Sequence, residues 1–155
     1  MLVKPYAIAF FGDGQEPFPT VEIVWTQSHA KVLRGMHFQR EPYASTKFMW
    51  CTAGALLEVV LDLRPTSPAY RSAHSVELTP TGTNGILIPA GCAHGFLALS
   101  DDTTVCYLLD KPFDSASDSG VRWDSFGFDW GTNNPLLSER DLNLRTLDEL
   151  FPTEH

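Results

Sequence analysis

The segment VLRGMHFQ, residues 32–39, holds one histidine between two large apolar residues, with Arg34 upstream and Gln39 downstream. An imidazole in this setting is a hydrogen-bonded core group, a metal ligand or a catalytic base, and composition alone favours the core group for His37. Arg34 and His37 are three positions apart, so a regular strand would send their side chains to opposite faces. Gly35 lies between them, and we predict a β-bulge there that re-aims one of the two side chains into the barrel mouth.

A second histidine ends the pattern P-x-G-x-x-H, which runs from Pro89 to His94 in GILIPAGCAHGF. The pattern resembles the second half-motif of the cupin superfamily, a double-stranded β-helix related to the jelly roll. Metal-binding cupins also have a first half-motif, in which two histidines flank one residue and a glutamate follows. The corresponding place here offers only His37, with Gln39 where the second histidine would stand. Transition metals bound by imidazole usually need about three firm protein ligands, so a metal site is disfavoured.

The bulk composition predicts an ordinary globular chain. It has 155 residues, 43% apolar and 19% charged, with a net charge of -8, which argues against a nucleic-acid partner. We interpret the initial MLVKPYAIAFFGDG as a strand rather than a signal peptide, and no stretch approaches a membrane span. Cys51, Cys92 and Cys106 are expected to be buried free thiols. We therefore expect one cytoplasmic domain, residues 1–155, without a membrane partner.

Short apolar runs separated by proline and glycine turns predict an all-β sandwich or barrel. ALLEVVLDL, residues 55–63, sets leucine and valine on one face and Glu58 and Asp62 on the other, which predicts a half-buried strand. HSVEL, GILI and TTVCYLL predict further strands. Only the C-terminal end has a helical pattern: Ser138 stands three residues before Asp141, as in a capping box, and leucines follow at helical spacing in LNLRTLDELF.

Five blocks in unbroken order, over about residues 30 to 145, resemble the dTDP-4-dehydrorhamnose 3,5-epimerase family. They are VLRGMHFQ, TKFMWCTAGALLEVVLDLRPTSPAY, IPAGCAHGFLALSDDTTVCYLLDKPF, SGVRWDSFGFDW and LLSERDLNL. The resemblance implies an all-β, cupin-type jelly roll (a double-stranded β-helix) with a short C-terminal helix. It also implies a homodimer that needs no metal and no cofactor. Such enzymes invert the carbons beside the keto group of a nucleoside-diphosphate 4-keto-6-deoxy sugar.

The same resemblance implies roles for three residues. A proton beside a ketone leaves only if a base takes it while the enolate oxygen is stabilised, and inversion then needs an acid on the opposite face. By motif, His37 in RGMHFQ would be the base, Asp141 in LSERD its partner, and Tyr107 in CYLLDKPF the acid. Each has a plainer alternative: a core histidine, a helix-capping aspartate and a core tyrosine.

Four further residues are expected to bind the substrate, again by resemblance: Arg34, Gln39, Lys47 and His94. Arg34 and Lys47 would lie near the diphosphate and the sugar, with Lys47 also stabilising the enolate, and His94 would contact the hexose. An acidic protein that binds a nucleotide sugar must gather positive charge in its cleft. The alternative for Arg34 and Lys47 is a solvated strand edge.

The chain departs from the family's pattern at two places. Glu22, Val24 and Thr26 replace a Q-x-N-x-S pattern that helps to bind the nucleotide base, so the nucleotide is left open. Phe113 stands where a second tyrosine is common, which leaves open inversion at C3, at C5 or at both. Two rival functions are a metal-dependent cupin enzyme and a non-catalytic sugar-binding cupin.

Overall fold

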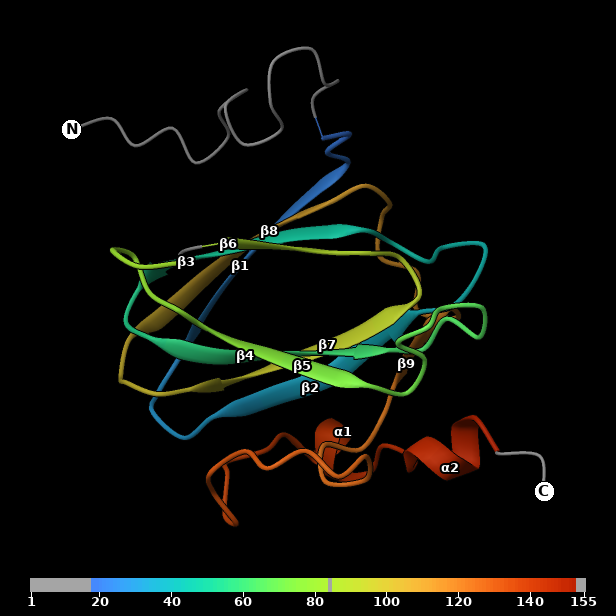
Figure 1. Ribbon diagram of the computed structural model, residues 1–155. Coiled ribbons are helices and arrows are strands. Elements are labelled where there is room, and N and C mark those ends of the chain that lie inside the picture. Colours follow the sequence, from blue (N-terminus) through green and yellow to red (C-terminus); the bar gives the residue numbers. More distant parts are fainter. Residues whose placement is uncertain (1–17, 84, 153–155) are drawn as a thin grey trace.

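Two antiparallel sheets packed face to face form the protein, as the computed structural model shows for residues 18–83 and 85–152 (Figure 1). One sheet has the strand order β1-β8-β3-β6 and the other has the order β5-β4-β7-β2-β9. The predicted all-β jelly roll is therefore confirmed. The strand expected in MLVKPYAIAFF lies outside the described residues. The elements are β1 Glu22–Ser28, β2 Leu33–Gln39, β3 Lys47–Ala53, β4 Leu56–Asp62, β5 Ala73–Leu78, β6 Gly85–Ile88, β7 Cys92–Ala98, β8 Thr103–Leu109, β9 Asp118–Gly120, α1 Glu139–Leu142 and α2 Leu147–Leu150.

Strand β4 is buried on both faces, which corrects the prediction of a half-buried strand. Val59 and Leu61 pack into a core on the outer face of their sheet. Glu58, at 0% exposure, and the buried Asp62 belong to the opposite face, which is turned toward the other sheet. The alternation was identified correctly, but its polar side faces the interior of the jelly roll, where both carboxylates have hydrogen-bond partners.

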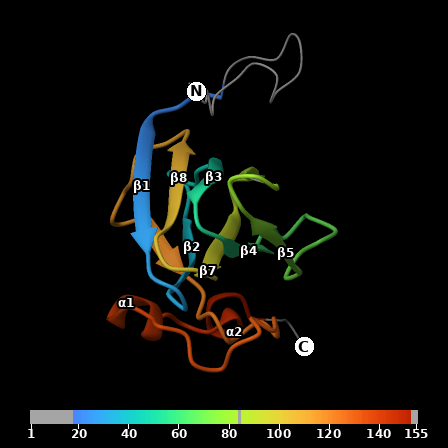
Figure 2. The same ribbon diagram turned by 90° about the vertical axis from the view of Figure 1, so that its left-hand side faces the viewer.

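The chain from about residue 121 to residue 151 covers the outer face of the five-stranded sheet (Figures 1 and 2). Trp130 is buried there, and its indole N–H donates to the Trp123 carbonyl at 2.9 Å. This cover explains why the strands beneath it are apolar on the outside. It also brings the C-terminal helices to the end of the sheet, where α1 contacts β2.

The C-terminal helical region forms two four-residue helices rather than the single short helix expected. Between them the chain pairs with the segment after β9, since the Arg122 N–H donates to the Arg145 carbonyl at 2.8 Å. This backbone pairing interrupts the helix that the leucine spacing predicts. The complete capping box belongs to α2, where Thr146 and Glu149 bond reciprocally.

The predicted bulge in β2 is confirmed. Pairing with β7 runs from Arg34 opposite Phe96 to His37 opposite His94, so three steps on β2 match two on β7. Gly35 lies in the bulge with φ +133°, and a Cβ atom there would stand 2.4 Å from the Gly95 Cα atom. The two backbones can approach this closely only because neither residue has a side chain.

Cys51, Cys92 and Cys106 are buried free thiols, as predicted. In the described part of the chain, no helix has the length and apolar character that crossing a membrane requires.

Replacing Gly35 by alanine is expected to lower the free energy of unfolding by about 3 kcal/mol or more, because strain at positive φ adds to overpacking against Gly95. Gly131 is the matched control, since its φ is +69° but its Cβ position is open. Gly131→Ala should cost only about 1 kcal/mol. Urea unfolding followed by circular dichroism measures the free energy of unfolding of both variants. Equal losses would show that the close approach of Gly95 adds nothing to the cost of the Gly35 substitution.

Candidate active site

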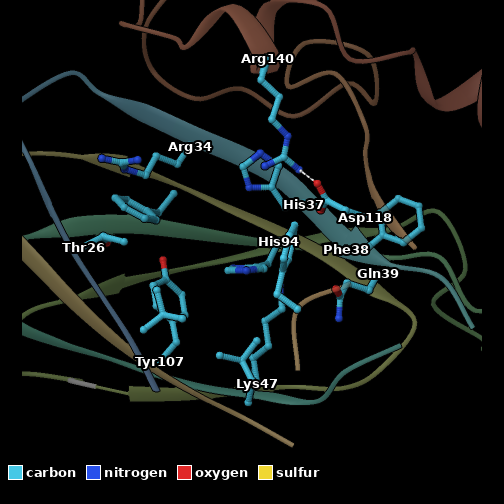
Figure 3. Close-up of a pocket in the computed structure, with 14 residues that line it drawn as sticks. Thr26, Arg34, His37, Phe38, Gln39, Lys47, His94, Tyr107, Asp118 and Arg140 are labelled. Carbon is cyan, nitrogen blue, oxygen red and sulfur yellow. Dashed lines mark ion pairs between the residues drawn. The ribbon is translucent and has the colours of Figure 1, made fainter. Parts of the chain in front are cut away.

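A pocket of about 310 Å³ lies between the two sheets (Figure 3). Six of the seven predicted site residues line it, and the seventh, Asp141, bonds to one of them. The sequence therefore identified residues that come together from β2, β3, β7, β8 and α1. The lining residues are Val24, Thr26, Arg34, His37, Phe38, Gln39, Lys47, His94, Phe96, Tyr107, Leu109, Phe113, Asp118 and Arg140.

His37 and Asp141 form a hydrogen-bonded pair, with 2.5 Å between His37 Nε2 and Asp141 Oδ1. Asp141 is 3% exposed, and its backbone N–H also donates to the Ser138 hydroxyl at the start of α1. Burial tends to raise the pKa of Asp141, but the bond to His37 and the His37 charge outweigh it and hold that pKa below its usual value. The carboxylate is therefore ionised and accepts the Nε2–H of His37. Nδ1 is then the nitrogen of His37 that can take a proton.

Tyr107 comes from β8 of the four-stranded sheet and faces His37 across the pocket (Figure 3). Its ring packs edge-on against the His94 ring, with centroids 5.8 Å apart. Burial and the nearby Glu58 raise the pKa of Tyr107 well above its ordinary value, although Arg34 and Thr26 oppose them. The phenol thus keeps its proton at neutral pH and can act as an acid rather than as a base.

His94 is held by Glu58, a residue predicted to lie on a polar strand face and not predicted as part of the site. The distance between His94 Nδ1 and Glu58 Oε1 is 2.8 Å. Burial raises the pKa of Glu58 well above its usual range. Burial lowers the pKa of His94, and the charges of Lys47 and His37 lower it further. The carboxyl and Nδ1 therefore share one proton across this bond, and the Nε2–H is free to donate toward the pocket.

Lys47 enters the pocket from the first position of β3. Burial lowers its pKa to about 8, an effect that the neighbouring Glu58 and Asp118 carboxyls partly offset and that Arg140 reinforces. A lysine with this pKa is largely a cation at neutral pH but holds its proton weakly. It can therefore stabilise a developing oxyanion.

Two arginines stand at the pocket, one predicted and one not. Arg34 is anchored on β1, its Nε donating to the Ser28 hydroxyl at 3.0 Å. Arg140 forms an ion pair of 2.6 Å with Asp118, drawn as a dashed line in Figure 3. This ion pair joins α1 to β9 directly beside Asp141. No motif in the sequence marked it, because its two residues are far apart in the chain.

Gln39 lines the pocket, but its side-chain amide is hydrogen-bonded to backbone groups. Its Nε2 donates to the carbonyls of Tyr43 and Pro112 at 2.9 and 3.2 Å, and its Oε1 accepts from the Asp114 N–H at 2.7 Å. These three bonds tie two loops to the end of β2. The structure therefore shows Gln39 as a support of the pocket wall, and its contact with substrate stays a prediction.

The residues that depart from the family pattern lie at the pocket. Val24 and Thr26 line it from β1, while Glu22 accepts a hydrogen bond of 2.8 Å from the Phe113 N–H. Phe113 itself is 59% exposed. This part of the pocket is accordingly apolar, with one carboxylate near its edge. Within residues 18–83 and 85–152, no three side chains of the His, Cys, Asp and Glu types converge as a metal-ligand set.

Comparison with known proteins assigns the chain to a family. The family model for dTDP-4-dehydrorhamnose 3,5-epimerase matches residues 4–149. A dTDP-4-dehydrorhamnose 3,5-epimerase of Sinorhizobium fredii is 40% identical over 121 residues, which are 76% of this chain and 62% of that protein. The chain thus spans less than two thirds of that relative's length.

Solved structures agree with this match. The dTDP-4-dehydrorhamnose 3,5-epimerase of Bacillus anthracis, solved with TDP and PPi bound, superposes with a TM-score of 0.82 at 33% identity, covering 85% of this chain and 77% of that one. ChmJ, a 3'-monoepimerase from Streptomyces bikiniensis in complex with dTDP-quinovose, gives a TM-score of 0.80 at 32% identity, covering 86% and 70%. With its jelly roll and its pocket, the chain belongs to the dTDP-4-dehydrorhamnose 3,5-epimerase family.

Proposed function

We propose that the protein epimerises a nucleoside-diphosphate 4-keto-6-deoxyhexose at C3, at C5 or at both. The observation that carries the proposal is that the His37–Asp141 pair and the Tyr107 phenol face one pocket from opposite sheets. A base and an acid on opposite sides of a sugar ring are what inversion of a carbon requires. The nucleotide and nucleotide-sugar ligands named for two structural relatives support a substrate of this class.

In the proposed reaction, His37 Nδ1 removes the proton from a carbon next to the C4 ketone. The bonding electrons move to the ketone oxygen, and the resulting enolate is stabilised by the Lys47 ammonium and by the His94 Nε2–H. Tyr107 then gives its proton to the same carbon from the other face, and the enolate returns to a ketone. Asp141 offsets the charge of the imidazolium, and proton exchange with solvent restores His37 and Tyr107.

The rest of the pocket suits an anionic substrate on an acidic protein. Arg34, positioned by Ser28, offers a guanidinium for the diphosphate, which it can bind through two parallel hydrogen bonds. Because the chain as a whole has a net charge of -8, this local positive charge would steer an anionic substrate to the pocket. Val24 and Phe113 would pack against the nucleoside or the sugar, with Gln39 keeping the wall in place.

A homodimer is part of the proposal, and the outer face of β1 is its candidate interface. Ile23 and Trp25 on this face are 64% and 62% exposed, and Val21, just before the strand, continues the alternation at 60%. Within the described residues β1 is also the edge of its sheet. Exposed apolar side chains along an unpaired strand edge favour association, and a second copy of the chain would cover both.

The dimer can be tested by placing a charge on that face. Trp25→Glu is expected to shift the protein from dimer to monomer in sedimentation velocity, because a carboxylate would be buried against the partner copy. Leu136→Glu is the control, since Leu136 is 56% exposed and remote from β1 in the chain. A wild-type protein that sediments as a monomer, or a variant that remains dimeric, would contradict this interface.

The epimerase itself is tested by proton exchange in heavy water. With a nucleotide-linked 4-keto-6-deoxyglucose, wild type should incorporate deuterium at each inverted carbon, as observed by NMR. His37→Ala should lose exchange by about 10² to 10⁴-fold, the usual worth of a general base. Tyr107→Phe should still exchange the proton that His37 removes for deuterium, but it should no longer invert the carbon.

The alternatives predict other outcomes of this experiment. Tight binding of several such nucleotides without exchange would instead indicate a non-catalytic sugar-nucleotide-binding protein. Activity that is lost on chelation and restored by one metal, with that metal found by elemental analysis, would indicate a metal-dependent enzyme.

The pH dependence should report Lys47. Its ammonium loses its proton as pH rises through about 8, so kcat/KM should fall above that pH as the enolate loses its cation. The guanidinium of Lys47→Arg stays charged throughout this range, so the variant should lack that alkaline limb whatever its remaining rate. Profiles of kcat/KM from neutral to alkaline pH are compared, and an unchanged limb in the variant would assign it to another group.

A further inference from the structure

The register of strands β1 and β8 places Thr26 next to Tyr107, the proposed acid. In the pairing of β1 with β8, Val24 stands opposite Tyr107, and Thr26 stands opposite Val105. Thr26 and Tyr107 are therefore diagonal neighbours on the inward face of one sheet, within reach of a long aromatic side chain. Both line the pocket, and Figure 3 shows the phenol oxygen on the side of the ring that points toward Thr26.

The Thr26 hydroxyl is a buried polar group without a hydrogen-bond partner in the described part of the chain. An unpaired buried hydroxyl costs free energy, so its retention needs an explanation. Thr26 also acts on the neighbouring phenol, because its hydroxyl lowers the pKa of Tyr107 against the effects of burial and Glu58. The phenol is thus the group that the hydroxyl can serve.

We propose that Thr26 is a positioning residue for Tyr107, donating its hydroxyl hydrogen to the phenolic oxygen. This inference rests on the proposed epimerase function. A phenol that accepts this bond keeps its own O–H free to point at the substrate carbon instead of turning toward β1. Once the proton has passed to that carbon, the same bond stabilises the phenolate that remains. Thr26 keeps its own proton throughout, and the phenolate is reprotonated from solvent.

The role predicts a specific kinetic signature, because Thr26 acts only on the step in which Tyr107 delivers its proton and the carbon is inverted. Loss of its hydroxyl should slow proton delivery by Tyr107 but leave proton removal by His37 intact. Enolate returned to its original face by the base gives exchange without inversion. The ratio of deuterium exchange to inversion at the same carbon therefore separates positioning of the acid from general damage to the pocket.

The test compares Thr26→Val, Thr26→Ser and wild type in heavy water, with exchange and inversion measured together by NMR. Valine has nearly the shape of threonine and suits a strand, so folding is expected to persist and is checked by thermal unfolding. Thr26→Val should raise the exchange-to-inversion ratio by about tenfold, the effect of one lost hydrogen bond. Thr26→Ser should restore the wild-type ratio.

Thr104→Val is the matched control, because it removes a hydroxyl from β8 that bonds to the Asp102 carbonyl and does not line the pocket. It should leave the ratio unchanged. An unchanged ratio in Thr26→Val, or a rise of the same size in Thr104→Val, would overturn the role of Thr26 while leaving the epimerase intact. Absence of exchange in wild type would overturn the proposed function and this role with it.

Discussion

The close approach of Gly35 and Gly95 is the constraint on which the site depends. It allows β2 to bulge against β7, and the bulge places Arg34 and His37 in one pocket although they are three residues apart. A side chain on either glycine would push the two strands apart, and His37 would lose its place opposite His94. The geometry of the proposed base thus depends on two residues that have no side chain to contribute to the chemistry.

Burial then determines which groups carry charge. The same low-polarity interior raises the pKa values of Glu58 and Tyr107 and lowers that of Lys47. Asp141 is the exception, because its partners His37 and Ser138 outweigh the cost of burial. The result is an ionised Asp141 beside His37 on one side of the pocket and a protonated phenol on the other, which is the asymmetry that acid–base inversion needs.

Local patterns in the sequence predicted several of the strands and the bulge, and the family resemblance predicted most of the pocket. Alternation identified β4 and β8, and the spacing of Arg34 and His37 around a glycine identified the bulge. Burial of both faces of β4 could not be predicted, because it depends on the cover supplied by residues far along the chain. Asp118, Arg140 and Glu58 were missed for the same reason, since their partners are distant in sequence. A glutamate in the middle of an apolar strand was the one available signal for Glu58.

Asp141 belongs both to the start of α1 and to the pocket: its backbone N–H donates to the capping Ser138 hydroxyl, while its carboxylate bonds to His37. This has a thermodynamic consequence. A four-residue helix has no stability of its own, so α1 exists only while its segment is docked on the sheet. Any local unfolding of that segment separates Asp141 from His37. The fraction of molecules with an assembled dyad therefore equals the fraction with a docked segment, and local stability and catalytic competence become one equilibrium.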